Sequence, residues 1–246
     1  MIVLENVGKS YGKHQALTGL NLTIPVGKII GLVGENGSGK STLLKIIAGL
    51  TTPSSGTIQV NGIRATRRIA SEVAYMPDAD VFYPFFSVER LFRFYETQFE
   101  DFNYSKACIV AKYLNVPLDA KLKNLSKGNR GRAKMAATLG REASYYLLDE
   151  PFSGFDPLVR EDIIKGMIQF TDPETQTVLM STHEIKEAEP LLDAIVLLNH
   201  GKILAYEEIE TIRDQYGVDA ITWMTKLIKE GDLNGNETYR RIEKSI

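Results

Sequence analysis

The sequence has little of what marks secreted or membrane-spanning proteins. Its single cysteine, Cys108, cannot form an internal disulfide, which is typical of a protein kept in a reducing compartment. No apolar run reaches the ~18 residues needed to span a bilayer, and residues 1–15 lack the charged-then-apolar pattern of a signal peptide. The net charge of −2 gives no basic excess for binding nucleic acid. These absences predict a protein in the cytosol, or one docked to a membrane from the cytosolic side.

What is present indicates a folded α/β domain. The chain has 246 residues, of which 43% are hydrophobic, enough to bury a sizeable core. Short apolar runs alternate with helical patterns, an order typical of a mainly parallel sheet covered by helices. The paired stretches are "KIIGLVG" with "KSTLLKIIAGL", "SYYLLDEP" with "PLVREDIIKGMIQF", and "TVLMSTHE" with "IKEAEPLL". Chemistry is expected beyond the C-terminal ends of those strands.

Other segments depart from this alternation. Residues 2–24 and the stretch "GTIQVNGI" predict an antiparallel β layer beside the parallel sheet. Between about residues 80 and 142 helical periods replace strands, and Ser87 is the expected N-cap of the first helix. We therefore predict one domain over residues 1–216 with a helical subdomain at about 80–142, followed by a partly helical tail at 217–246.

The stretch "GENGSGKS", Gly34 to Ser41, matches the phosphate-loop pattern and lies between a predicted strand and a predicted helix. Its glycines allow the tight turns that direct backbone N–H groups at phosphate oxygens, and the helix places its positive end there. Lys40 is expected to reach the β and γ phosphates, and Ser41 to bind Mg²⁺. The predicted cis nucleotide contacts are Gly34, Asn36, Gly37, Ser38, Gly39, Lys40, Ser41 and Thr42.

Two further strand ends carry polar residues. In "YYLLDEP", Asp149 suits the Mg²⁺ shell, and Glu150 could polarise the water that attacks the γ phosphate. His183 ends "TVLMST", where it could contact that phosphate and water, although a lone histidine there could also be structural. The predicted catalytic residues are Glu150, His183 and Lys40.

A second helix start that suits an anion occurs at "LSKGNRGR", Leu125 to Arg132. A simple helix cap explains this local pattern equally well. Similarly, Asp156 and Pro157 form a good N-cap and first-turn pair. The cations around the second helix start could form a stripe toward nucleotide, or a solvated face; they are Lys121, Lys123, Lys127, Arg130, Arg132 and Lys134.

Together, the ordered motifs resemble the nucleotide-binding subunit of an ABC transporter: phosphate loop, helical insert, "LSKGN", "LLDEP", "SGFDP" and "STHE". The resemblance covers the chain to about residue 210 and implies the ABC ATPase fold, an ATPase activity, and ATP and Mg²⁺ as ligands. It implies a second ATPase subunit, identical or not, and an integral membrane permease as partners, at the cytoplasmic face of the membrane. It also implies that Tyr11 stacks on adenine, although such a residue could simply be half-buried in a strand.

In this family two subunits pair head to tail with ATP between them. By that resemblance Ser126, Gly128 and Asn129 would contact, in trans, the nucleotide on the partner's phosphate loop. This arrangement would explain why one chain carries two segments suited to binding phosphate. The alternative is a soluble ATP-switched clamp or assembly factor of the same superfamily, without a permease.

The sequence departs from the family pattern at two places. The signature usually reads L-S-G-G-Q, whereas Lys127 and Asn129 stand at its third and fifth positions; the lysine is more like exporter ATPases. The usual glutamine after the "YM" strand is Asp78, which we expect either to contact Mg²⁺ or to face solvent. The expected metal ligands are therefore Ser41, Asp149 and Asp78.

Overall fold

The computed structural model describes residues 1–80, 82–183 and 185–233. Its central sheet has six strands, five of which run parallel, while β10 at one edge pairs antiparallel with β9. In spatial order they are β10 (Lys202–Glu208), β9 (Ala194–Asn199), β3 (Ile29–Val33), β8 (Thr177–Thr182), β7 (Tyr145–Asp149) and β6 (Val73–Met76). The mainly parallel sheet is as predicted, but the sequence patterns did not single out β9 and β10.

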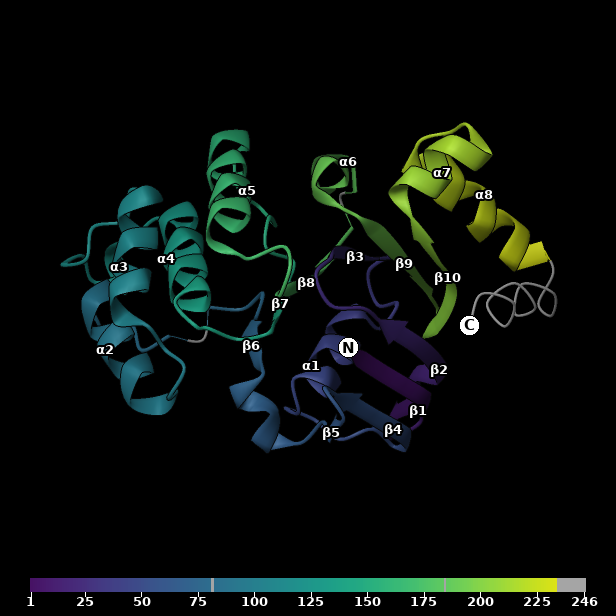
Figure 1. Ribbon diagram of the computed structural model, residues 1–246, viewed down its shortest axis with the longest axis horizontal. Helices are drawn as coiled ribbons and strands as arrows, with labels where there is room; N and C mark the ends of the chain where they lie inside the picture. The colour runs from purple at the N-terminus through teal and green to yellow at the C-terminus, as the bar shows by residue number, and fades with distance from the viewer. Residues whose placement is uncertain (81, 184, 234–246) are drawn as a thin grey trace.

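A second, antiparallel sheet lies below the central one in Figure 1. Its order is β2 (His14–Ile24), β1 (Ile2–Tyr11), β4 (Ser55–Val60) and β5 (Ile63–Arg64). The first two strands come from the segment 2–24, which confirms the expected antiparallel layer. The short 3₁₀ helix η1 (Arg67–Ser71) then leads into β6.

The central sheet is buried on both faces, so two apolar clusters form. On β7, Tyr145 and Leu147 join the cluster shared with α1 (Lys40–Ile47) and the antiparallel sheet. The alternate residues Tyr146 and Leu148 join the cluster on the opposite face. Because successive strand side chains point to opposite faces, a continuously apolar strand such as this one suits a sheet covered on both sides. This burial fixes where β7 ends, and thus where Asp149 lies.

The segment between residues 82 and 142 supplies the helices at one end of the molecule (Figure 1). They are α2 (Val88–Gln98), α3 (Tyr104–Tyr113), the 3₁₀ helix η2 (Leu122–Asn124) and α4 (Lys127–Leu139). Ser87 caps α2 as expected, because its side chain accepts a hydrogen bond from the Arg90 N–H. The division of the chain into domains remains a prediction.

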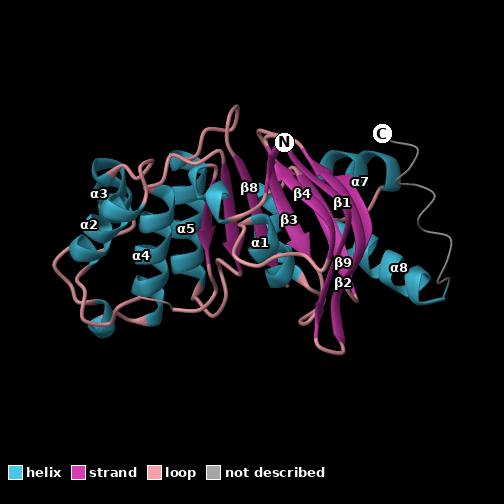
Figure 2. Ribbon diagram, turned by 90° about the horizontal axis from the view of Figure 1, so that it is seen from below, coloured by secondary structure: helices cyan, strands magenta, loops and turns pink. Residues whose placement is uncertain are grey.

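The C-terminal half supplies the remaining helices. Asp156 caps α5 through the Val159 N–H, and Pro157 occupies its first turn, as expected. The helices are α5 (Pro157–Phe170), α6 (Ile185–Ala188), the 3₁₀ helix η3 (Glu189–Leu191), α7 (Ile209–Tyr216) and α8 (Ala220–Leu233). Figures 1 and 2 both show α7 and α8 at the end opposite α2 and α3. The rest of the predicted tail, residues 234–246, lies outside the described residues.

Candidate active site

The phosphate loop, residues 34–41, joins β3 to α1 and depends on its glycines. Gly37 and Gly39 have φ angles of 83° and 109°, which side chains other than glycine rarely adopt. A Cβ at Gly34 would lie 2.0 Å from the carbonyl oxygen of Leu198. Ser38 is 4% exposed, and its hydroxyl has no hydrogen-bond partner within the described part of the chain. A tight loop at a helix start with an unpaired buried hydroxyl fits the oxygens of a phosphate ligand.

Lys40 folds back onto this loop. Its ammonium donates hydrogen bonds to the carbonyl oxygens of Gly34 at 2.7 Å and Glu35 at 3.1 Å. Its Nζ also lies 3.8 Å from Glu150 Oε1. Burial lowers the pKa of Lys40, and the charges of Glu150 and Asp149 act in the opposite direction. The loop therefore holds a buried cation at the point where phosphate charge would arrive.

Asp149, at the end of β7, is 3% exposed and accepts three hydrogen bonds. Ser41 and Ser181 each donate through Oγ to Oδ1 at 2.8 Å, and the Tyr75 hydroxyl donates to Oδ2 at 3.1 Å. Burial and the charge of Asp149 raise the pKa of Tyr75, so its phenol remains a donor. The pair of Asp149 and Ser41 provides the hard oxygen ligands that suit Mg²⁺, which commonly takes one or two carboxylates and completes its shell with phosphates and water.

Glu150 and His183 meet directly beside Lys40. His183 Nδ1 lies 2.8 Å from Glu150 Oε2, and the Glu150 N–H donates to Ser181 Oγ at 2.9 Å. Glu150 has a φ of 49°, in the left-handed region that a non-glycine residue seldom occupies. This backbone conformation and the His183 contact give the carboxylate a defined orientation at the carboxyl ends of β7 and β8.

The remaining predicted cis residues do not join this network directly. Tyr11 ends β1 and is 49% exposed, with the Lys9 ammonium 4.9 Å from its ring centroid. Asn36 is exposed and Thr42 is half-buried. Asp78 is exposed, and its carboxylate has no hydrogen bond or ion pair to any described residue. Both roles considered for Asp78, metal contact and solvent exposure, are compatible with this placement.

The predicted trans residues lie apart, at the start of α4. Ser126 is the N-cap, and its Oγ accepts a hydrogen bond from the Asn129 N–H at 3.2 Å. In the described structure no hydrogen bond joins this segment to residues 34–42. A surface hollow opens here, which we call the signature hollow; it is lined by Ser126, Lys127, Gly128, Asn129, Arg132, Gly154, Phe155, Asp156, Leu158 and Val159.

Two residues that donate hydrogen bonds to Asp149 were not predicted from the sequence. Ser181 pairs with Asp149 in the register of β8 and β7, and Tyr75 lies on β6, the other neighbour of β7. Both residues could have been found only if the order of the strands in the sheet had been known. Lys134 was expected among cations that form either a stripe toward nucleotide or a solvated face; a solvated position is wrong for Lys134, because it is only 6% exposed and lies against the loop that carries Asp78. Its ammonium finds backbone carbonyls there, which compensates its burial.

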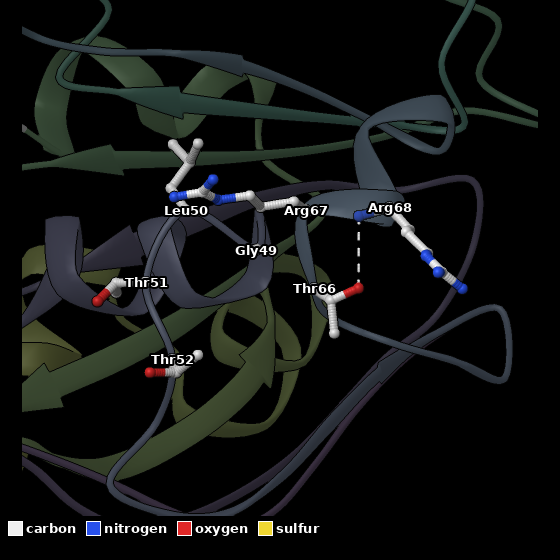
Figure 3. A pocket seen from close by; sticks show the side chains of 7 residues that line it. All are labelled: Gly49, Leu50, Thr51, Thr52, Thr66, Arg67 and Arg68. Carbon is white, nitrogen blue, oxygen red and sulfur yellow. Dashed lines mark hydrogen bonds between the residues drawn. The ribbon is translucent and has the colours of Figure 1, made fainter.

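A second hollow lies elsewhere, where α1 ends and η1 begins (Figure 3). It is lined by Gly49, Leu50, Thr51, Thr52, Thr66, Arg67 and Arg68. In Figure 3 the Arg67 side chain extends toward Leu50, whereas the Arg68 side chain points away. None of the residues predicted for the nucleotide site lines this hollow, so it is not part of the candidate active site.

The family model described as "ABC transporter" matches residues 17–153, more than half of the chain. The chain belongs to the ABC transporter family. It is therefore an ATP-binding ABC ATPase of the kind that serves transporters, as the resemblance implied.

Curated relatives of this ABC ATPase are named for different directions of transport. The chain is 33% identical over 220 residues to a probable sulfate/thiosulfate import ATP-binding protein of Chlorella vulgaris, covering 87% of this chain and 93% of that one. It is 32% identical over 230 residues to the Nod factor export ATP-binding protein I of Cupriavidus metallidurans, covering 90% and 76%. These relatives support membership of the family, but their names include both import and export and so do not give the direction of transport.

Solved structures agree on the fold. An ATP-binding subunit of an ABC transporter superposes with a TM-score of 0.81 at 25% identity, covering 93% of this chain and 99% of that one. A dimeric ATP-binding cassette in a post-hydrolysis state superposes with a TM-score of 0.75 at 24% identity, covering 85% and 98%. The ABC ATPase fold is confirmed. Within the described residues, no helix is both long enough and apolar enough to cross a bilayer.

Proposed function

We propose that this ABC ATPase dimerises around ATP and uses its hydrolysis to drive an integral membrane transporter. The observation that carries the proposal is the contact network at the carboxyl ends of β7 and β8. Four side chains meet there beside the tight, glycine-dependent phosphate loop: Lys40, Asp149, Glu150 and His183. Such a network combines phosphate binding, a metal-ligand carboxylate and a base in one place.

The cis half of the site would bind the nucleotide. The backbone N–H groups of the phosphate loop and the Lys40 ammonium would hold the phosphates, and Tyr11 would stack on adenine through its exposed ring. Ser41 and Asp149, with Asp78 as a third ligand, would hold Mg²⁺. When bound, Mg²⁺ would neutralise charge on the phosphate oxygens.

Hydrolysis would depend on Glu150. Its carboxylate would accept a proton from the attacking water while the bond between the β and γ phosphates breaks, giving ADP and inorganic phosphate. The contact between His183 Nδ1 and Glu150 Oε2 would keep the carboxylate oriented. Because Glu150 also lies near Lys40, the base would be positioned next to the phosphate that is attacked.

The trans half of the site would come from a second subunit. Ser126, Gly128 and Asn129 line the open signature hollow, and the Ser126 hydroxyl bonds only within its own helix start in the described structure. We propose that they complete the site of the partner's nucleotide, in a homodimer or a heterodimer. Lys127 beside them would add a cation near the phosphates.

The membrane partner is proposed from the family and from exposed aromatic residues. Tyr83 and Phe85 are 50% and 60% exposed at the helical end of the molecule, with ring centroids 5.7 Å apart. An exposed apolar surface of this kind suits a segment of a membrane subunit. We place the protein at the cytoplasmic face of the membrane, without nucleic acid as a partner. Lys127 in the signature is the reason we favour an exporter.

Two experiments test this function. Glu150→Gln should form an ATP-dependent dimer in sedimentation, because it keeps nucleotide binding and loses hydrolysis. Coexpression with candidate membrane subunits should then recover a complex whose ATPase rate changes on adding transport substrate. A chain that hydrolyses ATP as a stable soluble assembly and never associates with a membrane subunit would instead be a soluble clamp.

A further inference from the structure

The loop 77–80 follows β6 and carries Asp78, the residue that replaces the family's glutamine. Met76 pairs with Leu148 in the register of β6 and β7, so the loop leaves the sheet at the edge where Asp149 ends β7. The hydroxyl of Tyr75 on β6 donates a hydrogen bond to Asp149 at this edge, so Asp78 follows β6 at the metal-ligand end of β7. Its own carboxylate bonds to no described residue, so something else must hold the loop.

Lys134, on α4, holds it. Its Nζ donates to the carbonyl oxygen of Pro77 at 3.0 Å and to that of Asp78 at 2.7 Å. Asp80 Oδ1 lies 3.5 Å from the same nitrogen. Burying a lysine ammonium is costly unless hydrogen bonds and an opposite charge compensate, and both are present here. Burial nevertheless lowers the pKa of Lys134, with Asp80 opposing that shift.

Arg130, one turn earlier on the same helix, extends this attachment. Its Nε donates to Asp80 Oδ2 at 2.7 Å, and its Nη1 donates to the carbonyl oxygen of Leu125 at 2.6 Å. Leu125 immediately precedes Ser126, the N-cap that lines the signature hollow. The two cations thus attach the loop 77–80 to the helix that presents the trans residues.

We propose that Lys134 is a positioning residue for Asp78: from α4, which we call the signature helix, it holds the loop 77–80 so that the Asp78 carboxylate is kept beside its own chain's nucleotide site. One consequence rests on the head-to-tail dimer proposed above. Nucleotide bound near Asp78 is linked through this attachment to the placement of Ser126, so that each chain's own site influences how it completes the partner's. Such linkage is reciprocal, because two sites coupled through one element must affect each other equally.

The test is ATP-driven dimerisation in the Glu150→Gln background, measured by sedimentation. Lys134→Met removes the cation and retains an apolar side chain of similar length. We expect it to weaken dimerisation about 10-fold, within the usual range of coupling between sites, and to leave the affinity of the monomer for ATP without Mg²⁺ within about twofold. Lys134→Arg should restore dimerisation in part. Lys112→Met, an exposed lysine on α3 that lines neither site, is the matched control and should change neither quantity.

A double-mutant cycle with Asp78→Ala separates positioning from a structural role. If Lys134 acts through Asp78, Lys134→Met should cause no further loss in the Asp78→Ala background. Fully additive losses, or normal dimerisation of Lys134→Met alone, would overturn the proposal. Should Lys134→Met fail to fold, Asp80→Asn decides the matter, because it removes the counter-charge with little change in shape. If the Lys134-intact protein itself never dimerises with ATP, the proposed function fails rather than this inference.

Discussion

The phosphate loop and the signature hollow differ in how fully the chain satisfies its own polar groups. At the phosphate loop, Lys40 binds two backbone carbonyls and Asp149 accepts three hydrogen bonds, so the cis groups are held in place by the same chain. At the signature hollow, the Ser126 hydroxyl contacts just one of the described polar groups, the Asn129 N–H of its own helix start. One half-site is therefore arranged by tertiary contacts within its own chain, whereas the other is a capped helix start that would make its nucleotide contacts in the dimer.

The largest expected effect concerns the cis half. Glu150→Gln removes the base, so kcat should fall on the order of 10²- to 10⁴-fold while ATP affinity is retained. Single-turnover hydrolysis and equilibrium binding with labelled ATP measure the two quantities. A rate close to that of the unmodified protein would show that Glu150 is not the base. Glu161→Gln, at an exposed residue of α5, serves as the control.

Lys40→Ala should weaken the binding of ATP and not only slow its hydrolysis. Loss of a charge-assisted contact to phosphate is worth about 1.5–3 kcal/mol, or roughly 10- to 100-fold in Kd. Isothermal titration of the monomer with ATP checks this. Because Lys40 is buried against the loop, the thermal unfolding midpoint should be measured alongside, and a folded variant with unchanged affinity would contradict its cis role.

A smaller effect, on the stability of the fold, is expected from a change where the signature helix packs on the segment before α5. A Cβ at Gly131 would lie 2.1 Å from Phe155 Cζ, so Gly131→Ala should destabilise the fold by about 1–3 kcal/mol. Chemical denaturation measures the loss. Combining it with Phe155→Leu should recover much of the stability, because the smaller side chain leaves room for the added methyl group. No rescue would mean that the steric account is incorrect.

The smallest expected effect is a loss of metal affinity when Tyr75 is changed. Tyr75→Phe removes one of three hydrogen bonds to Asp149, a loss of about 1 kcal/mol. The midpoint for Mn²⁺ binding in the presence of nucleotide, followed by electron paramagnetic resonance, should rise about fivefold, while ATP binding without metal stays the same. An unchanged midpoint would show that the phenol does not help to orient the carboxylate.

Much of the candidate site could be predicted because its residues lie in local patterns. The phosphate loop needs glycines at fixed positions. Asp149 and Glu150 are the first polar residues after a run of apolar strand residues, so the end of the strand could be located from the sequence. Tyr75 and Ser181 could not be predicted in the same way, because their contacts depend on which strands flank β7. The burial of Lys134 could not be predicted for a related reason: a lysine in a helix that carries several cations is ordinarily solvated, and only the packing of α4 against the loop 77–80 reveals its two carbonyl partners. The left-handed backbone of Glu150 likewise leaves no sign in the sequence.

The central claim, that each nucleotide is held by two chains, is tested most directly by mixing two defective variants. In the Glu150→Gln background, Lys40→Ala removes the cis half and Ser126→Arg blocks the trans half, so neither should dimerise with ATP alone. A mixed dimer, however, contains a single intact site, formed by Lys40 of one chain and Ser126 of the other. The account predicts that mixing restores ATP-dependent dimers with nucleotide retained at that site. If the mixture behaves like its separate components, and Ser126→Arg also loses ATP binding as a monomer, the signature serves its own chain and the account is contradicted.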